Sequence, residues 1–400
     1  MILLYIMDIN QLKYIQPVLD EFVNKNQASG LNLLIYKDNQ ELGYWQSGLR
    51  DLENNQPYDR NTIVRLFSMS KPVTAVAAMI LVEEGKLDPA EEVWNYLPEY
   101  KNLTVCTEKG RKGKARPAWS QLLVKDLLNM TGGYTYGAWS EDSPLGEHLT
   151  SDLIAELNKD AAGENRITTR EVAKRLAAIP LSFDPGTDYS YGLCADILGA
   201  VIEAASGMKF SDFLKKRIFN PLGMKDTDFY VPEEKQKRLA KVYRSIYEDS
   251  SASRHLEPFT DCNLGIQYKM DHAPAFESGG AGLCSTVDDY MRFAHMLSNG
   301  GSIDGVQLLH PATVKRLASA RLMPELQKRF DIKMPHLAGY SYCNLLRVAE
   351  NADFGWDGWL GPFVSMDINT KLTIVMTMQR CDSGTTTAAR RVQNILYSAL

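Results

Sequence analysis

Ser68 and Lys71 are the two residues whose chemistry and spacing are most informative in this sequence. They stand three positions apart in the segment Phe67-Ser68-Met69-Ser70-Lys71-Pro72, directly before an apolar run. On a helix, side chains at i and i+3 share one face, with Cβ atoms about 5 to 6 Å apart, so the amine reaches the hydroxyl. Because a serine hydroxyl becomes a nucleophile only beside a base, the pair predicts covalent catalysis through a serine ester.

The apolar run from Val73 to Val82 predicts a helix that is buried on every face and ends at Gly85. Free N–H groups at the start of such a helix can stabilise an oxyanion formed beside Ser68. The alternative interpretation is purely structural, with Ser68 and Ser70 as helix-capping residues.

The same spacing recurs at Ser206 and Lys209 and serves as an internal control. There Gly207 is placed to end the preceding helix, so that this second pair is predicted to lie in a loop. Only Ser68 has a buried helix directly after it.

The segment around Ser68 resembles the S-x-x-K motif of the class C β-lactamase-like serine hydrolases. This superfamily contains β-lactamases, penicillin-binding proteins, D-amino-acid peptidases, S-x-x-K esterases and acyltransferases. Three further blocks resemble it in order and spacing: Leu127 to Tyr134, Pro221 to Thr227 and Gly279 to Thr286. The resemblance covers nearly the whole chain and is closest to the carboxylesterase branch of the family VIII type.

The second catalytic element of this superfamily is a tyrosine six residues after the proline of a P-G-T turn. Counted from Pro185, this position is Tyr191, which the resemblance implies as the base or its partner. Tyr189 is the alternative, and its structural interpretation is an aromatic residue of the cleft wall. Leu193 stands where other members carry an asparagine, so we expect apolar substrate contact there.

The third element is a K-T-G or H-x-G triplet on the strand at the edge of the cleft. Here Trp356, Asp357 and Gly358 resemble the W-G-G form of the esterase branch. A lysine at the first position would pair with a substrate carboxylate, which Trp356 cannot do. Gly358 permits close backbone approach, and the Trp359 N–H is implied as the second oxyanion donor, opposite that of Ser68.

The residues expected around the substrate are largely apolar and suggest an apolar pocket. The predicted substrate-binding residues are Tyr134, Tyr136, Leu193, Trp356, Asp357 and Gly358. If Asp357 faces the cleft, it repels anionic substrates and tolerates an amine.

Strand patterns at both ends of the chain predict a single antiparallel sheet. Two hairpins are expected, from 30–38 with 41–48 and from 361–368 with 371–378, with covering helices at 8–23 and 386–400. Shorter helices are expected at 126–130, 153–158, 169–178, 196–205, 210–218 and 287–298.

The fold class that these elements and the resemblance imply is α/β (α+β), β-lactamase/transpeptidase-like, with an antiparallel sheet flanked by helices. We expect residues 1–85 and 325–400 to form the sheet domain and residues 86–324 to form an inserted, mostly helical lobe. The active site is expected in the cleft between the two parts.

Composition and charge exclude several other classes of protein. The 400 residues are 44% hydrophobic and 23% charged, as in folded globular proteins. The formal net charge of −5 gives no basic footprint for nucleic acid or an anionic membrane. The basic run from Lys109 to Arg116 is interpreted as a solvated loop.

The six cysteines and six histidines show no metal-ligand or disulfide spacing, so we expect no metal and no cofactor. The apolar run from Met1 to Met7 is too short to cross a bilayer, and no basic segment precedes it. We therefore expect a cytoplasmic protein. Met7 is an alternative natural start, and a truncated signal sequence is the alternative interpretation of the apolar run.

These features together predict acyl transfer through an ester of Ser68, with neutral Lys71 or a Tyr191 phenolate as the base. Small neutral esters fit the pocket best, so we predict a carboxylesterase that also transfers acyl groups to other acceptors. A D-amino-acid peptidase or amidase and a weak β-lactamase are alternatives. A non-turnover, penicillin-binding-like sensor is the alternative from another class. The expected partner is a small ester or amide, with no nucleic acid and no membrane.

Overall fold

The structure, a computed structural model, describes residues 7–248 and 253–400. The apolar segment 1–6 lies outside the described residues, and so does the prediction about the natural start of the chain.

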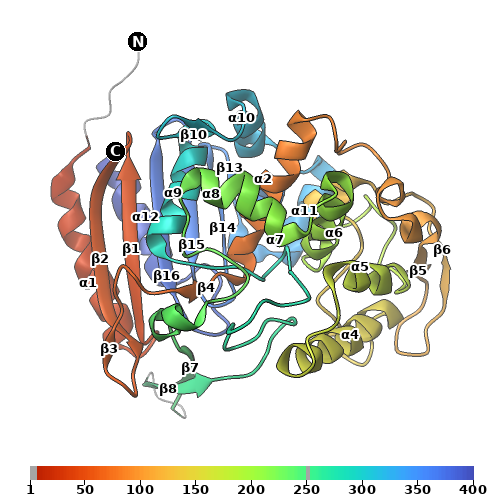
Figure 1. The fold of residues 1–400 in the computed structure, drawn as a ribbon, viewed down its shortest axis with the longest axis horizontal. Coiled ribbons are helices and arrows are strands. Elements are labelled where there is room, and N and C mark those ends of the chain that lie inside the picture. The colour runs from red at the N-terminus through yellow and green to blue at the C-terminus, as the bar shows by residue number, and fades with distance from the viewer. Residues whose placement is uncertain (1–6, 249–252) are drawn as a thin grey trace.

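An eight-stranded antiparallel sheet forms the centre of the molecule (Figure 1). In spatial order its strands are β12 (Tyr340–Cys343), β13 (Leu346–Ala349), β14 (Asp353–Asp357), β15 (Phe363–Asp367), β16 (Leu372–Met378), β1 (Gly30–Lys37), β2 (Gln40–Asp51) and β3 (Gln56–Pro57). The two ends of the chain meet where β16 pairs with β1, with Leu34 opposite Val375. The prediction of one sheet built from both termini is therefore confirmed.

The turn between β1 and β2 lies one residue earlier than predicted. Asp38 and Asn39 have φ values of 49° and 64°, and β2 already begins at Gln40. Asp and Asn are the non-glycine residues that adopt this left-handed conformation most readily, and tight hairpin turns require it. The prediction had placed Asn39 and Gln40 in the turn.

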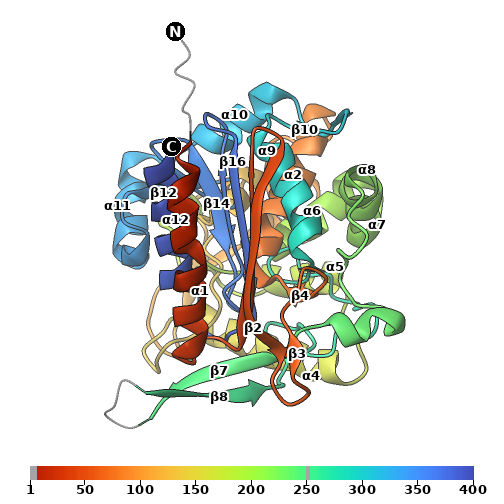
Figure 2. The ribbon, with the colours of Figure 1, turned by 90° about the vertical axis from the view of Figure 1, so that its left-hand side faces the viewer.

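Two helices cover one face of the sheet, α1 (Ile15–Asn24) and α12 (Thr387–Ala399) (Figure 2). Their buried apolar residues, among them Leu19 and Val392, pack on the outward side chains of β1 and β16. The first helix was expected from residue 8, but a 3-10 turn (Ile9–Tyr14) precedes α1. The reason is Pro17, which has no N–H to donate and is tolerated only in the first turn of an α-helix.

The opposite face of the sheet is covered by α9 (Val287–Ser298), which contacts β1, β15 and β16. Beside it lies α2 (Ser70–Glu83), which contacts β14 and α6 (Cys194–Ser206). All residues of α2 from Ser70 to Leu81 are buried, as the apolar run predicted. The N-terminal end of α2 thus lies against the sheet at the end of β14.

The remaining helices lie mainly beyond α2, away from the two terminal helices (Figure 1). They are α3 (Val124–Leu128), α4 (Leu145–Ala162), α5 (Thr169–Ala177), α7 (Phe210–Leu214), α8 (Asn220–Leu222), α10 (Pro311–Ser319) and α11 (Pro324–Lys333). Four short strand pairs complete the fold: β4 (Val64–Arg65) with β9 (Cys284–Ser285), β5 (Thr104–Cys106) with β6 (Ala115–Pro117), β7 (Val242–Tyr247) with β8 (Arg254–Phe259), and β10 (Ser302–Ile303) with β11 (Val306–Gln307). Within residues 7–248 and 253–400, no helix combines the length and hydropathy of a membrane span.

Candidate active site

Ser68 lies in a 3-10 turn, Phe67–Met69, that leads directly into α2. Phe67 has a φ of 45°, a left-handed conformation that is uncommon for an aromatic residue and persists only where its surroundings enforce it. The ring centroid of Phe67 lies 5.0 Å from that of Trp359. The turn leaves Ser68 partly exposed between two buried neighbours. Its side chain therefore faces the open side of the turn.

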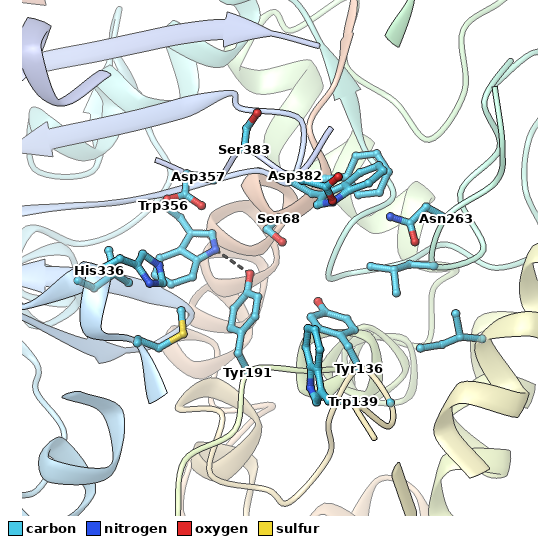
Figure 3. A pocket seen from close by; sticks show the side chains of 18 of the residues that line it. Ser68, Tyr136, Trp139, Tyr191, Asn263, His336, Trp356, Asp357, Asp382 and Ser383 are labelled. Carbon is cyan, nitrogen blue, oxygen red and sulfur yellow. Dashed lines mark hydrogen bonds between the residues drawn. The ribbon is translucent and has the colours of Figure 1, made fainter. Parts of the chain in front are cut away.

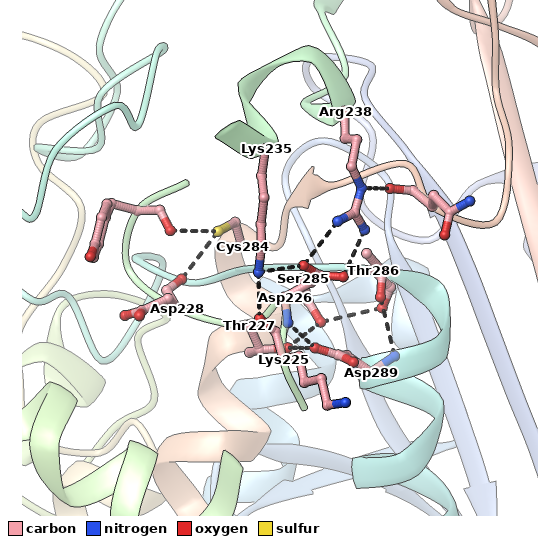
Figure 4. A network of polar contacts seen from close by, with 12 residues as sticks. Lys225, Asp226, Thr227, Asp228, Lys235, Arg238, Cys284, Ser285, Thr286 and Asp289 are labelled. Atoms are coloured by element: carbon pink, nitrogen blue, oxygen red, sulfur yellow. Dashed lines mark hydrogen bonds and ion pairs between the residues drawn. The ribbon is translucent and has the colours of Figure 1, made fainter. Parts of the chain in front are cut away.

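A buried polar network fixes the strand that supports this turn (Figure 4). β4, just before the turn, pairs with β9. In β9, Ser285 Oγ lies 2.7 Å from Thr227 Oγ1, and Thr227 Oγ1 donates to the buried carboxylate of Asp289 at 3.0 Å. The backbone N–H of Asp226 donates to the same carboxylate at 2.6 Å. The strand that leads into the turn of Ser68 is thus anchored by buried hydrogen bonds.

The side chain of Lys71 is fully buried, and its Nζ has three polar neighbours. Nζ lies 3.1 Å from Ser68 Oγ, 2.9 Å from Tyr136 Oη and 2.9 Å from the carbonyl oxygen of Gly280. A carbonyl oxygen only accepts, so one N–H of the amine goes to Gly280. A neutral amine can give its second N–H to Tyr136, and its lone pair then faces the Ser68 hydroxyl. The geometry suits an amine that takes a proton from Ser68.

Tyr191 completes the group of polar side chains around Ser68 (Figure 3). Its hydroxyl accepts a hydrogen bond of 2.8 Å from Trp356 Nε1, and Lys71 Nζ lies 4.7 Å from the centre of its ring. An indole N–H is only a donor, so the phenol accepts from Trp356 and keeps its own proton for another partner. The Ser68 hydroxyl lies near enough to the phenol oxygen to lower the pKa of Tyr191.

Burial shifts the pKa values of the amine and the phenol in opposite directions. Loss of hydration lowers the pKa of Lys71 to about 8, although the charges of Asp196 and Asp357 act to raise it. Burial raises the pKa of the Tyr191 phenol, and the hydrogen bonds of Ser68 and Trp356 oppose this rise. Both shifts favour the neutral forms. Near neutral pH a neutral Lys71 is therefore accessible and a Tyr191 phenolate is not.

Asp196, in the first turn of α6, is a residue of the site that sequence reasoning missed. Its Oδ1 accepts hydrogen bonds from Ser278 Oγ at 2.5 Å and from the backbone N–H of Gly280 at 3.1 Å. The carbonyl of the same glycine accepts from Lys71, so Asp196 positions the acceptor that orients the amine. A single carboxylate within the apolar run 194–202 was the signal that could have identified it.

A cavity of about 590 Å³ opens over Ser68. Tyr136, Tyr191, Trp356 and Asp357, all predicted site residues, line it. The rest of its wall is formed by Phe67, Gly137, Ala138, Trp139, Ile154, Asn263, Leu264, Met334, His336, Leu337, Trp359, Asp382, Ser383 and Gly384. Among the described residues, the wall contains neither lysine nor arginine. The described chain also has no cluster of three or more His, Cys, Asp or Glu side chains that could hold a metal ion.

Comparison with known proteins gives a match to the family model described as Beta-lactamase over residues 15–397. The chain belongs to the beta-lactamase family. Protein Rv1367c of Mycobacterium tuberculosis (strain ATCC 25618 / H37Rv) is 28% identical over 396 residues, which span 94% of this chain and 92% of the relative. Esterase EstB of Burkholderia gladioli is 30% identical over 288 residues, or 70% of this chain and 68% of the relative.

The fold comparison agrees with this membership of the beta-lactamase family. The solved structure of EstCE1, a hydrolase with promiscuous acyltransferase activity, matches with a TM-score of 0.75 at 23% identity and covers 97% of this chain and 98% of that one. The predicted resemblance and fold class are therefore confirmed. The chain is an enzyme, a serine hydrolase of the beta-lactamase fold.

Tyr134 and Leu193, both predicted to contact the substrate of this beta-lactamase-family enzyme, do not line the cavity. Each is only 2% exposed and packs in the main hydrophobic core. Tyr134 packs edge-on against Tyr100, because Tyr136, two residues later, takes the position that faces Ser68. Leu193 is the residue directly before α6, and its side chain belongs to the core around that helix. Leu193 therefore makes its apolar contacts with the hydrophobic core, and the prediction of a substrate contact there was wrong.

Tyr189, the alternative to Tyr191, does not line the cavity either. Its ring is fully buried and lies 5.1 Å from the ring centroid of Phe330 and 5.5 Å from that of Tyr342. Among the described residues its hydroxyl has no hydrogen-bond partner. The structure thus brings Tyr191, and not Tyr189, to Ser68 and Lys71.

Two backbone N–H groups at the cavity are free to donate. In residues 7–248 and 253–400, neither the N–H of Ser68 nor that of Trp359 donates to another protein atom. Gly358 allows the two segments to meet, since a Cβ there would lie 2.3 Å from the carbonyl oxygen of Leu66. The close approach predicted for Gly358 is therefore to the turn that carries Ser68, and Gly358 itself does not line the cavity.

Most lining residues that the sequence did not reveal come from loops and from the short 3-10 turn Pro335–Leu337. They are contributed by the segments 137–139, 263–264, 334–337 and 382–384, together with Ile154 of α4. Residues in loops follow no helical or strand period, so composition and spacing give no signal for them.

Proposed function

We propose that this enzyme is a carboxylesterase that forms an acyl-enzyme on Ser68 and hydrolyses small esters with neutral acyl groups. The observation that carries the proposal is the hydrogen bond from Trp356 Nε1 to the Tyr191 hydroxyl. Trp356 stands where the K-T-G form of the triplet has a lysine for a substrate carboxylate, and its one polar hydrogen serves Tyr191 instead. In the described chain, no lysine or arginine lines this cavity, so none could pair there with a substrate carboxylate. Similarity to Esterase EstB supports an ester substrate.

In the proposed acylation step, neutral Lys71 takes the proton of Ser68 while Oγ attacks the ester carbonyl carbon. The new oxyanion accepts hydrogen bonds from the backbone N–H groups of Ser68 and Trp359. When the carbonyl re-forms, the bond to the alcohol oxygen breaks. Tyr191 supplies a proton to that oxygen and regains one from the protonated amine of Lys71.

The acyl group is then released from Ser68 by the same side chains. A water molecule gives its proton to neutral Lys71 and attacks the acyl carbon. When the carbonyl re-forms, the bond to Ser68 Oγ breaks, and Oγ takes a proton from Tyr191, which regains one from the protonated amine of Lys71. An alcohol can take the place of water, which gives acyl transfer. The printed description of EstCE1 as a hydrolase with acyltransferase activity supports this second outcome for the present chain.

A D-amino-acid peptidase or amidase is the second candidate. Asp357 and Asp382 both line the cavity, and carboxylates there would attract the amine of a D-aminoacyl group. Weak β-lactamase activity and a non-turnover sensor use the same Ser68 chemistry and differ only in the substrate or in the rate of deacylation.

The test is a turnover assay with p-nitrophenyl butyrate, D-alanine p-nitroanilide and nitrocefin, combined with intact-mass measurement of the protein. We expect sustained release of p-nitrophenol from the ester and slower or no turnover of the other two. Preference for the anilide would favour the peptidase, and preference for nitrocefin the β-lactamase. A stable acyl adduct without turnover would contradict the esterase proposal and identify a sensor.

The rate of ester hydrolysis is expected to depend on pH through Lys71. Its pKa of about 8 means that, below this pH, each unit of decrease lowers the neutral fraction of the amine by about tenfold. kcat/KM for p-nitrophenyl butyrate should therefore rise with pH up to about 8 and then level off. The measurement is kcat/KM between pH 5.5 and 9.5, after correction for spontaneous hydrolysis.

Asp196→Asn provides the matched variant for this pH profile. The charge of Asp196 raises the pKa of Lys71, so its removal should lower that pKa and move the rising limb of the profile to lower pH. The asparagine carbonyl still accepts a hydrogen bond from Gly280 or Ser278. A limb that stays in place or moves to higher pH would contradict the role of Lys71 as the titrating base.

A further inference from the structure

A second cavity, of about 340 Å³, lies next to the catalytic cavity. The two cavities share His336 and Leu337 as lining residues, and Thr385 of the second cavity donates a hydrogen bond to Asp357 of the first. Figure 3 shows His336 and Trp356, both on the wall of the catalytic cavity. We call the second cavity the arginine cavity, because three arginines line it: Arg347, Arg390 and Arg391.

Arg347, on β13, is the residue that sets this cavity apart. Its side chain is 1% exposed. Among the described residues it forms no ion pair with a carboxylate, and its Nη1 has no hydrogen-bond partner. Nη2 donates to the carbonyl oxygen of Val364 at 2.9 Å. A buried guanidinium without a counter-charge is unfavourable in a protein interior, so a compensating anion is expected.

The surroundings hold Arg347 in place without neutralising it. Its guanidinium lies 4.6 Å from the ring centroid of Phe363 and 5.5 Å from that of Tyr340, both in the wall of the arginine cavity. The buried carboxylate of Asp353 is already used by other donors, accepting from Ser365 Oγ at 2.5 Å and from Gln393 Nε2 at 2.9 Å. The arginine is thus preorganised, and its charge remains available.

Within the described chain, the wall of the arginine cavity contains three arginines and no aspartate or glutamate. Arg391 is paired with Glu21 at 2.8 Å, whereas the side chain of Arg390 donates only to the carbonyl of Thr385 among the described residues. The acidic neighbours are Asp353 and Asp357, and the charge of Arg347 reaches Asp357, since it lowers the pKa of that carboxyl against the larger effect of burial. Two arginines without carboxylate partners therefore face one small cavity.

We propose that the arginine cavity binds a carboxylate or phosphate group, carried by the ester substrate at a distance from its scissile bond. The inference rests on the proposed function for the identity of the carrier. It refines that function, because the reaction centre takes a neutral acyl group while recognition of the substrate depends on a distant anion bound by Arg347 and Arg390.

Direct binding tests the site without any catalysis. Isothermal titration of the whole protein with inorganic phosphate and with succinate should show saturable binding of at least one anion. Arg347→Met should weaken this binding at least tenfold. Arg390→Ala should weaken it as well and, because Arg390 is exposed, should leave folding intact. Arg111→Ala, which removes an exposed arginine paired with Asp152 elsewhere, should change nothing. Absence of saturable binding, or equal binding by all variants, would overturn the proposal.

A matched pair of esters identifies the carrier of the anion. 4-Acetoxybenzoate has a neutral acetyl group and carries a free carboxylate on its phenol part, whereas methyl 4-acetoxybenzoate carries none. We expect at least a tenfold lower KM for the carboxylate form in the original protein and equal KM values in Arg347→Met. Equal KM values for the two esters in the original protein would refute the claim that the substrate carries the anion, even if phosphate binds. If neither ester is hydrolysed but an anion still binds saturably, the esterase function is refuted and the anion-binding site is supported.

Discussion

Replacing Ser68 by alanine is expected to abolish covalent labelling by a p-nitrophenyl alkylphosphonate and to lower ester hydrolysis by about 10⁴-fold or more. The phosphonate forms a stable bond only with an activated hydroxyl, and Ser68 is the hydroxyl that lies 3.1 Å from a buried amine. The mass of the intact protein reports the label, and release of p-nitrophenol reports turnover. A melting curve checks that the variant is folded.

Ser206→Ala is the matched control for this experiment. Ser206 has the same spacing to Lys209 as Ser68 has to Lys71, but Lys209 pairs with Glu277 at 2.5 Å. The residue after Ser206, Gly207, has a φ of 68° and ends α6, as predicted. This variant should be labelled by the phosphonate and should hydrolyse the ester as the original protein does. Labelling that survives in Ser68→Ala and disappears in Ser206→Ala would refute the choice of nucleophile.

The comparison of the two serines shows what the sequence can predict. Local spacing alone could not separate them, because both are three residues before a lysine. The apolar run after Lys71 does separate the two serines, because it predicts a buried helix that must pack against other elements. The structure confirms that helix and the sheet from both ends of the chain, because apolar periodicity reports burial directly.

The cavity wall was predicted less completely, for a physical reason. Tyr134 and Tyr136 are alike in sequence, yet only Tyr136 faces Ser68, since residues two apart in an irregular segment point in directions that no period determines. Asp196 was passed over because its partners, Ser278 and Gly280, are more than 80 positions away in the chain. Contacts of this kind depend on tertiary packing, which a single sequence does not contain.

The length of α4 was underestimated for a related reason. The sequence predicts a helix only at 153–158, where Leu153 and Leu157 follow an apolar period, but the structure has it from Leu145 to Ala162. Its additional buried residues include His148 and Thr150, polar side chains that a hydrophobic pattern does not count. Thr150 satisfies its hydroxyl within the helix by donating to the carbonyl of Gly146 at 2.8 Å.

Lys71→Met is expected to lower kcat/KM by about 10³-fold to 10⁴-fold, the usual contribution of a positioned base. The stability of the fold should change far less. A pKa of about 8 instead of 10.5 corresponds to about 3 kcal/mol against burying the charged amine, which methionine removes. Loss of the hydrogen bond to Gly280 acts in the opposite direction. Kinetics with p-nitrophenyl butyrate and melting curves measure the two effects.

This divergence between activity and stability distinguishes a base from a structural lysine. Lys209→Met is the control, because Lys209 neutralises Glu277, whose side chain is only 2% exposed. That variant should lose stability, since it leaves a buried carboxylate without its cation, and should keep its activity at temperatures where it is folded. Lys71→Met should do the reverse. If Lys71→Met retained a tenth of the original kcat/KM, another group would have to deprotonate Ser68, and Tyr191, whose phenolate burial disfavours, would be the remaining candidate.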